Sequence, residues 1–346
     1  MKNLFSTFYF VLLIISMIDC YENAFLSESK IISMKVINKE VLATGLTNGN
    51  INLVNLSNGK VIKTLLKHTH SVFSLELLKN ETLISGSADH TINVWNTTTY
   101  QLIRTLKGHT DCILCLTLLH DGTLVSGSKD NSIKFWNVTS GKVIKTLSDN
   151  DSPIRKLMVI NSQIIISSSE NQILKVWNTL TGQLVKKLNN YEISSFSILS
   201  NKIFVSATSN DLEIQLWNST SFELIKTIQV KTFIRSFLRI NDQTLICGGV
   251  DLNVLQILNT TESKIIKTLH NHSDNNNVFT YLEILEYGKF VSVKENSIQI
   301  WSHQWNNLAT SIANETFTPS NSSITINNLR LFKIILILFF AFITKI

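Results

Sequence analysis

The sequence predicts an all-β fold, a seven-bladed β-propeller with four antiparallel strands in each blade. Three observations lead to it. A tryptophan followed by asparagine, or an equivalent pair, recurs seven times between Val54 and Trp301 at intervals of 40 to 43 residues. Each interval contains four short runs in which apolar and polar residues alternate and β-branched residues are frequent, a pattern typical of strands. No interval shows a helical period, and four short strands in each copy of such a repeat are typical of a propeller blade.

The four strands of each unit follow in a constant order. The first is an apolar run such as SVFSLELL or CILCLTLL, and a short turn such as His120-Asp121-Gly122 comes after it. The second run, as in TLISGS, ends in Ser-Gly-Ser, and a polar turn with Asp or Asn leads to the third, as in TINVW or EIQLW. A turn of Thr, Ser and Gly precedes the fourth, as in KVIKTL, QLIRTL or QLVKKL. Because polar turns separate runs of only four to eight residues, each unit is expected to fold as a small antiparallel sheet.

These units resemble WD40 repeats, with Asn where that family usually has Asp after the tryptophan. The resemblance covers about residues 26–312 and is strongest in the second and third units, of which only the third keeps the Gly108-His109 dipeptide. Seven units match the commonest blade number of the family. The marker pairs are Val54-Asn55, Trp95-Asn96, Trp136-Asn137, Trp177-Asn178, Trp217-Asn218, Leu258-Asn259 and Trp301-Ser302.

The stretch SGSADHTINVWN at residues 85–96 returns almost unchanged as SGSKDNSIKFWN at residues 126–137. Its Ser, Asp and His could be read as a hydrolase site, but a catalytic site occurs once in a chain, and we predict no catalytic residue here. The resemblance implies instead a hydrogen-bonded brace, which satisfies a buried indole N–H and a buried Asp turn. The residues that match the brace are His68, Ser85, Asp89 and Trp95 in the second unit, His109, Ser126, Asp130 and Trp136 in the third, and Ser167 and Trp177 in the fourth, where Asn150 takes the place of the His.

Both ends of the chain are apolar. Residues 1–20 resemble a secretory signal peptide, although Ile18 and Cys20 fit the cleavage pattern poorly, and a signal anchor or an outer strand is the competing interpretation. Residues 313–330 form a Ser/Thr/Asn-rich spacer before an apolar tail at residues 331–346. Small residues, a polar spacer and a terminal apolar run are typical of a GPI-attachment signal, whereas a short membrane anchor and a merely adhesive tail are the alternatives.

The predicted location is therefore the secretory pathway and the cell surface, with membrane attachment through the tail, and a cytoplasmic protein is the alternative. Ten N-x-[ST] triplets permit glycosylation without proving it, because the Asn, Ser and Thr content would supply many by chance. They begin at Asn55, Asn80, Asn96, Asn137, Asn150, Asn218, Asn259, Asn271, Asn314 and Asn321.

Metal and nucleic-acid sites are not predicted. Cys112 and Cys115 have CxxC spacing, but they lie in an apolar, strand-like run without a second Cys or His pair, so a zinc site lacks ligands and packed core cysteines are expected. The net charge of +6 is small for 346 residues, and Lys2, Arg330 and Lys333 among its carriers lie in the apolar ends. A nucleic-acid groove would need a stronger positive field.

The last fourth-strand candidate is LATSI at residues 308–312, and residues 22–29 compete for the same sheet edge. That edge must be paired, because an open strand edge invites aggregation.

The resemblance implies a non-enzymatic scaffold that binds a protein or peptide, with no cofactor, through loops around one mouth of the channel. Those loops precede the first strand of a unit or link its second strand to its third. Their charges are mixed in sign, which favours peptide recognition over phosphate recognition. The candidate contact residues are His70, Asp111, Lys129, Arg155, Glu170, Glu192, Asn210 and Arg235. The alternative function is an intracellular substrate-binding adaptor, similar to the propeller of F-box/WD ubiquitin ligases, although no F-box-like helical segment precedes the units.

Overall fold

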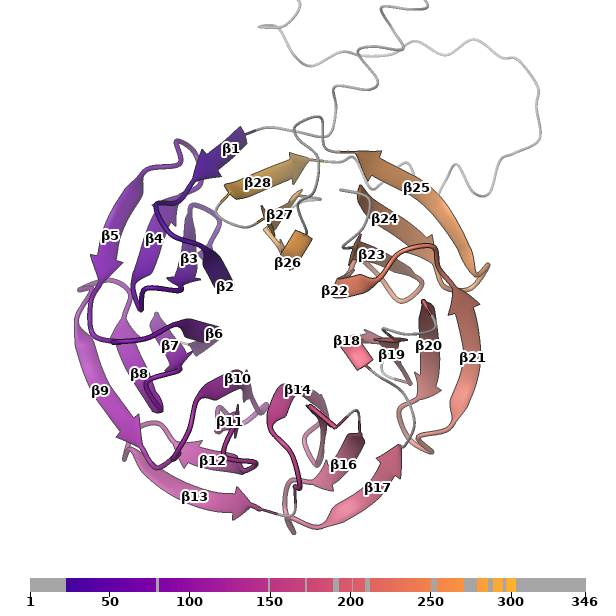
Figure 1. Ribbon diagram of the computed structural model, residues 1–346, viewed down its shortest axis with the longest axis horizontal. Helices are drawn as coiled ribbons and strands as arrows, with labels where there is room; N and C mark the ends of the chain where they lie inside the picture. The colour runs from indigo at the N-terminus through magenta and orange to yellow at the C-terminus, as the bar shows by residue number, and fades with distance from the viewer. Residues whose placement is uncertain are drawn as a thin grey trace, which may run out of the picture. The chain divides into compact units, whose positions relative to one another are not determined.

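The computed structural model describes residues 23–302 except 79–80, 149, 172, 189–192, 201, 209–211, 250–253, 271–278, 286–288 and 295–296. In this part of the chain the structure confirms the predicted fold class: seven four-stranded antiparallel sheets follow one another around a ring (Figure 1). The described residues contain strands, turns and bends but no helix, and hence no apolar helix of membrane-spanning length. The two predicted terminal segments, residues 1–20 and 313–346, lie outside the described residues.

The first six blades each consist of four consecutive strands. Blade 1 holds β2 (Ile31–Asn38), β3 (Val41–Leu46), β4 (Ile51–Asn55) and β5 (Val61–Leu65), and blade 2 holds β6 (Val72–Leu78), β7 (Thr82–Ser87), β8 (Thr91–Asn96) and β9 (Leu102–Lys107). Blade 3 holds β10 (Ile113–Leu118), β11 (Leu124–Ser128), β12 (Ile133–Asn137) and β13 (Lys142–Leu147), and blade 4 holds β14 (Ile154–Asn161), β15 (Ile164–Ser169), β16 (Leu174–Asn178) and β17 (Leu184–Leu188). Blade 5 holds β18 (Ile193–Ser200), β19 (Ile203–Thr208), β20 (Glu213–Asn218) and β21 (Leu224–Gln229), and blade 6 holds β22 (Ile234–Arg239), β23 (Thr244–Gly249), β24 (Val254–Asn259) and β25 (Lys264–His270).

Blade 7 combines the two ends of the described chain. It contains β26 (Phe279–Ile284), β27 (Lys289–Lys294) and β28 (Ser297–Ser302), and its fourth strand is β1 (Asn23–Leu26), which pairs antiparallel with β28 from Asn23↔Ile300 to Leu26↔Ser297. Of the two segments that could fill this edge, the structure places the N-terminal one there, as Figure 1 shows. The other segment, residues 308–312, lies outside the described residues.

The hydrophobic core lies between neighbouring blades. Ile84 and Ile92 of blade 2, for example, pack in one buried cluster with Ile113 and Trp136 of blade 3. The Ser-Gly-Ser sequence of the second strand follows from this close packing. A Cβ atom on Gly127 would lie 2.5 Å from the Cγ2 atom of Ile154 in blade 4, so no larger residue fits there without displacement.

In the first six marker pairs, the Asn caps the turn between the third and fourth strands. The Asn178 side-chain oxygen accepts hydrogen bonds from the backbone N–H groups of Leu180 and Thr181, both at 2.9 Å. Asn55, Asn96, Asn137, Asn218 and Asn259 accept corresponding bonds. Asn can replace Asp here because only the acceptor oxygen is used. Five of the N-x-[ST] triplets begin at these positions and therefore have a structural explanation.

In blades 2 to 5, a basic residue in the middle of the outermost strand ties the blade to the next one. The Nζ atom of Lys145 in β13 donates to the backbone oxygens of Thr179 and Leu180, in the turn of blade 4, at 2.9 and 2.5 Å. Arg104, Lys186 and Lys226 bind the following blade in the same way. Sequence reasoning treated these runs only as strands, yet the recurring basic residue of KVIKTL, QLIRTL, QLVKKL and ELIKTI is the signal for this contact.

Candidate functional site

The structure brings the residues of the expected brace together in blades 2 and 3. In blade 2, the Trp95 indole N–H donates to the Ser85 hydroxyl at 2.8 Å, and that hydroxyl lies 2.8 Å from His68 Nε2. His68 Nδ1 lies 2.7 Å from a carboxylate oxygen of Asp89. With the proton on Nδ1, every group in this row has a donor or an acceptor facing it. Blade 3 repeats the row, with 2.7 Å for each of the contacts Trp136–Ser126, Ser126–His109 and His109–Asp130.

The burial of these rows determines what they can do. The hydroxyls of Ser85 and Ser126 belong to residues with 0% exposure, and each already accepts an indole N–H. A nucleophilic serine must be reached by substrate and must lie beside donors for the developing oxyanion. The Ser-His-Asp order of this row therefore serves packing between strands, and the row links the loop before the first strand to the turn after the second.

The Asp residues of the braces predict how stability depends on pH. Burial by itself would raise the pKa of Asp89, but hydrogen bonds from His68 and Thr91 hold that pKa well below its usual range, and Asp130 behaves alike with His109 and Ser132. The folded-state pKa is thus lower than the unfolded value of about 3.9. The stabilisation is complete above about pH 5 and is lost as the pH falls from there towards the folded-state pKa.

We expect the free energy of unfolding, measured by urea titration, to fall steadily below about pH 4. In the Asp89→Asn, Asp130→Asn double variant this slope should be shallower, because two of the responsible carboxylates are gone. A double variant that keeps the full slope of the wild type would contradict the assignment.

Blade 4 has only half of the brace. The Trp177 indole N–H donates to Ser167 at 2.9 Å, as in the other blades. Asn150 occupies the His position and is buried, but neither its amide nitrogen nor its amide oxygen has a hydrogen-bond partner in the described part of the chain. Asn171 stands where the Asp would be, and its side-chain oxygen accepts from Ser169 instead. The row is therefore interrupted between Ser167 and the turn.

Restoring the missing residues of blade 4 should stabilise the protein. The Asn150→His, Asn171→Asp double variant can form the complete row, and we expect a gain of about 1–2 kcal/mol in the free energy of unfolding, since ring nitrogens with partners replace the two unsatisfied amide atoms of Asn150. The single variants should gain less than the double variant, because each leaves one end of the row open. A double-mutant cycle by urea unfolding measures this coupling, and a coupling energy of zero would show that the row does not form.

Six of the predicted contact residues are described, and they lie at one end of the ring, but not all of them on loops. His70 and Asp111 precede β6 and β10, and Lys129 and Glu170 lie in the turns after β11 and β15, as predicted. The placement of Arg155 and Arg235 on loops was wrong: each is the second residue of an innermost strand, β14 or β22, because the first strands of blades 4 and 6 begin earlier than the apolar pattern indicates. Glu192 and Asn210 lie outside the described residues.

These side chains form contacts across neighbouring segments of the mouth. Arg155 and Glu170, both exposed, form an ion pair within blade 4. Asp111 of blade 3 lies 4.0 Å from His90 of blade 2, measured between Oδ1 and Nε2. His70 and Lys129 are exposed. The mouth thus presents acidic and basic side chains that take no part in the buried braces.

The innermost strands bring further charged groups together that sequence reasoning missed. The Lys35 ammonium of β2 lies 3.1 Å from Glu76 of β6 and 3.3 Å from Glu283 of β26, so it joins three blades across the point of ring closure. Across the ring, Lys156 of β14 has two oxygen partners in the described chain, the Ser195 hydroxyl at 3.2 Å and the Arg235 carbonyl at 3.5 Å. Burial lowers the pKa of Lys156 to about 8. The alternation of apolar and polar residues on each first strand was the available signal for side chains at these positions, but it does not show which of them meet.

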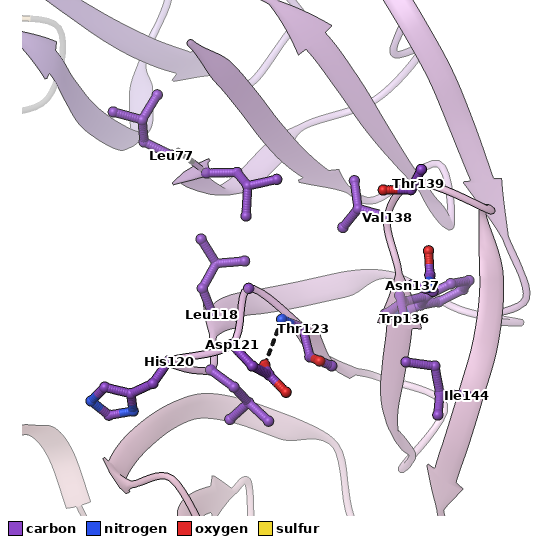
Figure 2. Close-up of a pocket in the computed structure, with 13 residues that line it drawn as sticks. Leu77, Leu118, His120, Asp121, Thr123, Trp136, Asn137, Val138, Thr139 and Ile144 are labelled. Carbon is purple, nitrogen blue, oxygen red and sulfur yellow. Dashed lines mark hydrogen bonds between the residues drawn. The ribbon is translucent and has the colours of Figure 1, made fainter. Parts of the chain in front are cut away.

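A pocket of about 640 Å³ lies at the other end of blades 2 and 3 (Figure 2). Leu77 and Leu118 come from the ends of β6 and β10, and the turn His120–Gly122 and the turn beginning at Val138 complete its rim. The pocket lies on the side away from the predicted contact residues, and sequence reasoning did not find it. The paired leucines that end the runs SLELL and CLTLL were the available signal.

The comparison with known families agrees with this architecture. A family model described as "WD domain, G-beta repeat" matches residues 59–96 and 100–137. These residues carry two WD40 repeats, within a seven-bladed propeller. Each match begins with the outermost strand of one blade, β5 or β9, and continues through three strands of the next, so the WD40 repeat is offset from the blade by one strand. Because of the same offset, β1 is the fourth strand of blade 7.

No curated protein matches this chain. The WD40 propeller fold is consistent with a scaffold for protein interactions, and members of this family generally bind proteins. That is the coarse function that the fold itself supports, and the residues at the mouth supply the detail proposed below.

Proposed function

We propose that this propeller is a non-enzymatic scaffold that binds a protein or peptide segment of mixed charge at the channel mouth formed by the second-to-third strand turns and the loops before the first strands. The observation that carries the proposal is the set of accessible acidic and basic side chains gathered there from blades 2, 3 and 4. Arg155 with Glu170 and Asp111 with His90 each place an acid beside a base.

Such a surface favours a peptide partner for a physical reason. Exposed ion pairs contribute little to stability, so these pairs can exchange partners without unfolding the blades. A charge on an incoming peptide can replace one member of a pair, and complementary charge raises the rate and the specificity of association.

The test compares partner capture by the full chain with capture by matched variants. Arg155→Glu and Asp111→Lys reverse a charge at the mouth, whereas His120→Asp changes an exposed residue at the rim of the pocket on the opposite end. We expect the proteins retained by the wild type to be lost with the first two variants and kept with the third. Equal capture by all four proteins would reject the mouth, and loss with His120→Asp alone would favour the opposite end.

We also propose that the propeller is displayed at a membrane on the secretory side, which the apolar ends of the sequence support. Endoglycosidase treatment of the native protein should increase its gel mobility, and a phosphatidylinositol-specific phospholipase should release it from membranes if the tail is a GPI signal. An unglycosylated protein in the cytosolic fraction would favour the intracellular adaptor instead.

A further inference from the structure

The loop before β10 and the turn before β8 place three metal-binding side chains together at the interface of blades 2 and 3. These are His90 from blade 2 and Asp111 and Cys112 from blade 3. One potential ligand atom from each residue lies within 4.8 Å of the other two, and His90 Nε2 and Asp111 Oδ1 are 4.0 Å apart. The group is therefore assembled by tertiary structure from positions 21 and 22 residues apart in the sequence.

The three atoms suit one ion in particular. Imidazole nitrogen, carboxylate oxygen and thiolate sulfur are the protein ligands of Zn²⁺, at about 2.0–2.3 Å from the metal. In a tetrahedral site, bonds of these lengths place the ligand atoms about 3.3–3.8 Å from one another. The separations in the structure, all within 4.8 Å, exceed this range by at most about 1.5 Å, a difference that side-chain rotation can remove in two loops at the surface.

The surroundings of the group position two of the three ligands. The Asp111 carboxylate accepts a hydrogen bond from the backbone N–H of Cys112 at 2.7 Å, which holds the carboxylate beside the thiol. The thiol itself faces the backbone oxygen of Ala88, in the turn that carries His90, at 3.7 Å. A hydrogen bond to a ligating carboxylate orients that ligand in known metal sites. The thiol gives up its proton when it binds a metal, so its contact with Ala88 shows only where the sulfur lies in the free protein.

The two cysteines of the CxxC spacing do not share one environment, although the sequence predicts that both pack in the core. Cys115 is not the partner of Cys112: it is buried against Gly127 and Ile154, on the side of blade 4. Cys112 is half-buried and faces blade 2, where His90 and its neighbours lie. The two cysteines of one strand-like run belong to two different blade interfaces.

We propose that His90, Asp111 and Cys112 form a Zn²⁺ site at the channel mouth, with a fourth coordination position open to water or to a ligand atom of a partner. Three protein ligands and one open position distinguish such a site from a closed structural zinc site. This proposal does not depend on the proposed partner-binding function, because Zn²⁺ can bind in the absence of any partner.

The test uses Zn²⁺ and Co²⁺ alone with the reduced full-length protein. We expect one equivalent of Zn²⁺ to bind in a competition titration with a chromophoric chelator, and Co²⁺ to give a sulfur-to-metal charge-transfer band. Cys112→Ser and His90→Ala should each weaken Zn²⁺ binding at least about tenfold, by analogy with the effect of losing even a supporting group, and Cys112→Ser should also abolish that band because it removes the sulfur. Cys115→Ser is the matched control and should bind like the wild type.

Substitution of Lys129 gives a second test, which leaves all three proposed ligands in place. The positive charge of Lys129 acts on both Asp111 and Cys112. Lys129→Met should therefore tighten Zn²⁺ binding. The proposal is overturned if the wild type binds no Zn²⁺, or if Cys112→Ser and Cys115→Ser bind it equally well.

Discussion

The Asp130→Ala variant is expected to lose about 3–4 kcal/mol of unfolding free energy. The Asp130 carboxylate accepts hydrogen bonds from the Thr110 and Ser132 N–H groups and the Ser132 hydroxyl, and it faces His109. Truncation leaves all of these donors without their acceptor in a site where the Asp side chain is only 9% exposed. Urea unfolding followed by tryptophan fluorescence measures the loss.

Asp121→Ala is the matched control in the same blade. Asp121 is exposed and accepts one hydrogen bond, from the Thr123 N–H at 2.8 Å, in the turn between β10 and β11. Truncation of this side chain should lower the free energy of unfolding by about 0.5 kcal/mol. If the two variants lose similar amounts, the brace does not carry the stability that its geometry indicates.

Deletion of residues 23–26 is expected to be similarly severe and to have a second consequence. Four register pairs between β1 and β28 disappear, which should cost about 3–4 kcal/mol, and the edge of β28 becomes free to pair with another chain. The variant should therefore unfold at lower urea concentration and should associate as its concentration rises. Urea unfolding and light scattering at several protein concentrations measure the two effects.

Deletion of residues 308–312 tests the competing closing strand. Since β28 already pairs with β27 on one side and β1 on the other, β28 has no free edge for another strand, and this deletion should change neither stability nor association. A loss of stability after this deletion, with none after deletion of residues 23–26, would exchange the roles of the two segments.

Much of the brace could be predicted because its chemistry is local and repeated. Ser85, Asp89 and Trp95 lie within one short stretch, and the same spacing returns with Ser126, Asp130 and Trp136. Repetition argued against catalysis, and the burial of the serines supports the same conclusion. What the pattern could not indicate is how the interrupted row of blade 4 behaves, because the fate of Asn150 depends on which neighbours reach it.

The candidate site was predicted less completely, because the positions of its side chains also depend on neighbouring segments. Arg155 and Arg235 lie on strands because the start of a first strand is set by its pairing with the second, as in Ile154↔Ser169, and not by its own apolar pattern. The meeting of Lys35 with Glu76 and Glu283 joins residues more than two hundred positions apart, which no local pattern reveals.

The repeat, the number of blades, the order of strands within each blade and the residues of the brace could all be predicted from the sequence, because they depend on periodicity and on contacts within one repeat unit. The segment that completes blade 7, the basic residues that bind the following blade, and the place of His90 beside Asp111 and Cys112 became known from the three-dimensional structure. The first contact joins the two ends of the described chain, and the others join side chains of neighbouring blades. Their partners are chosen by the packing of the blades and the closure of the ring, which the pattern within one unit does not specify.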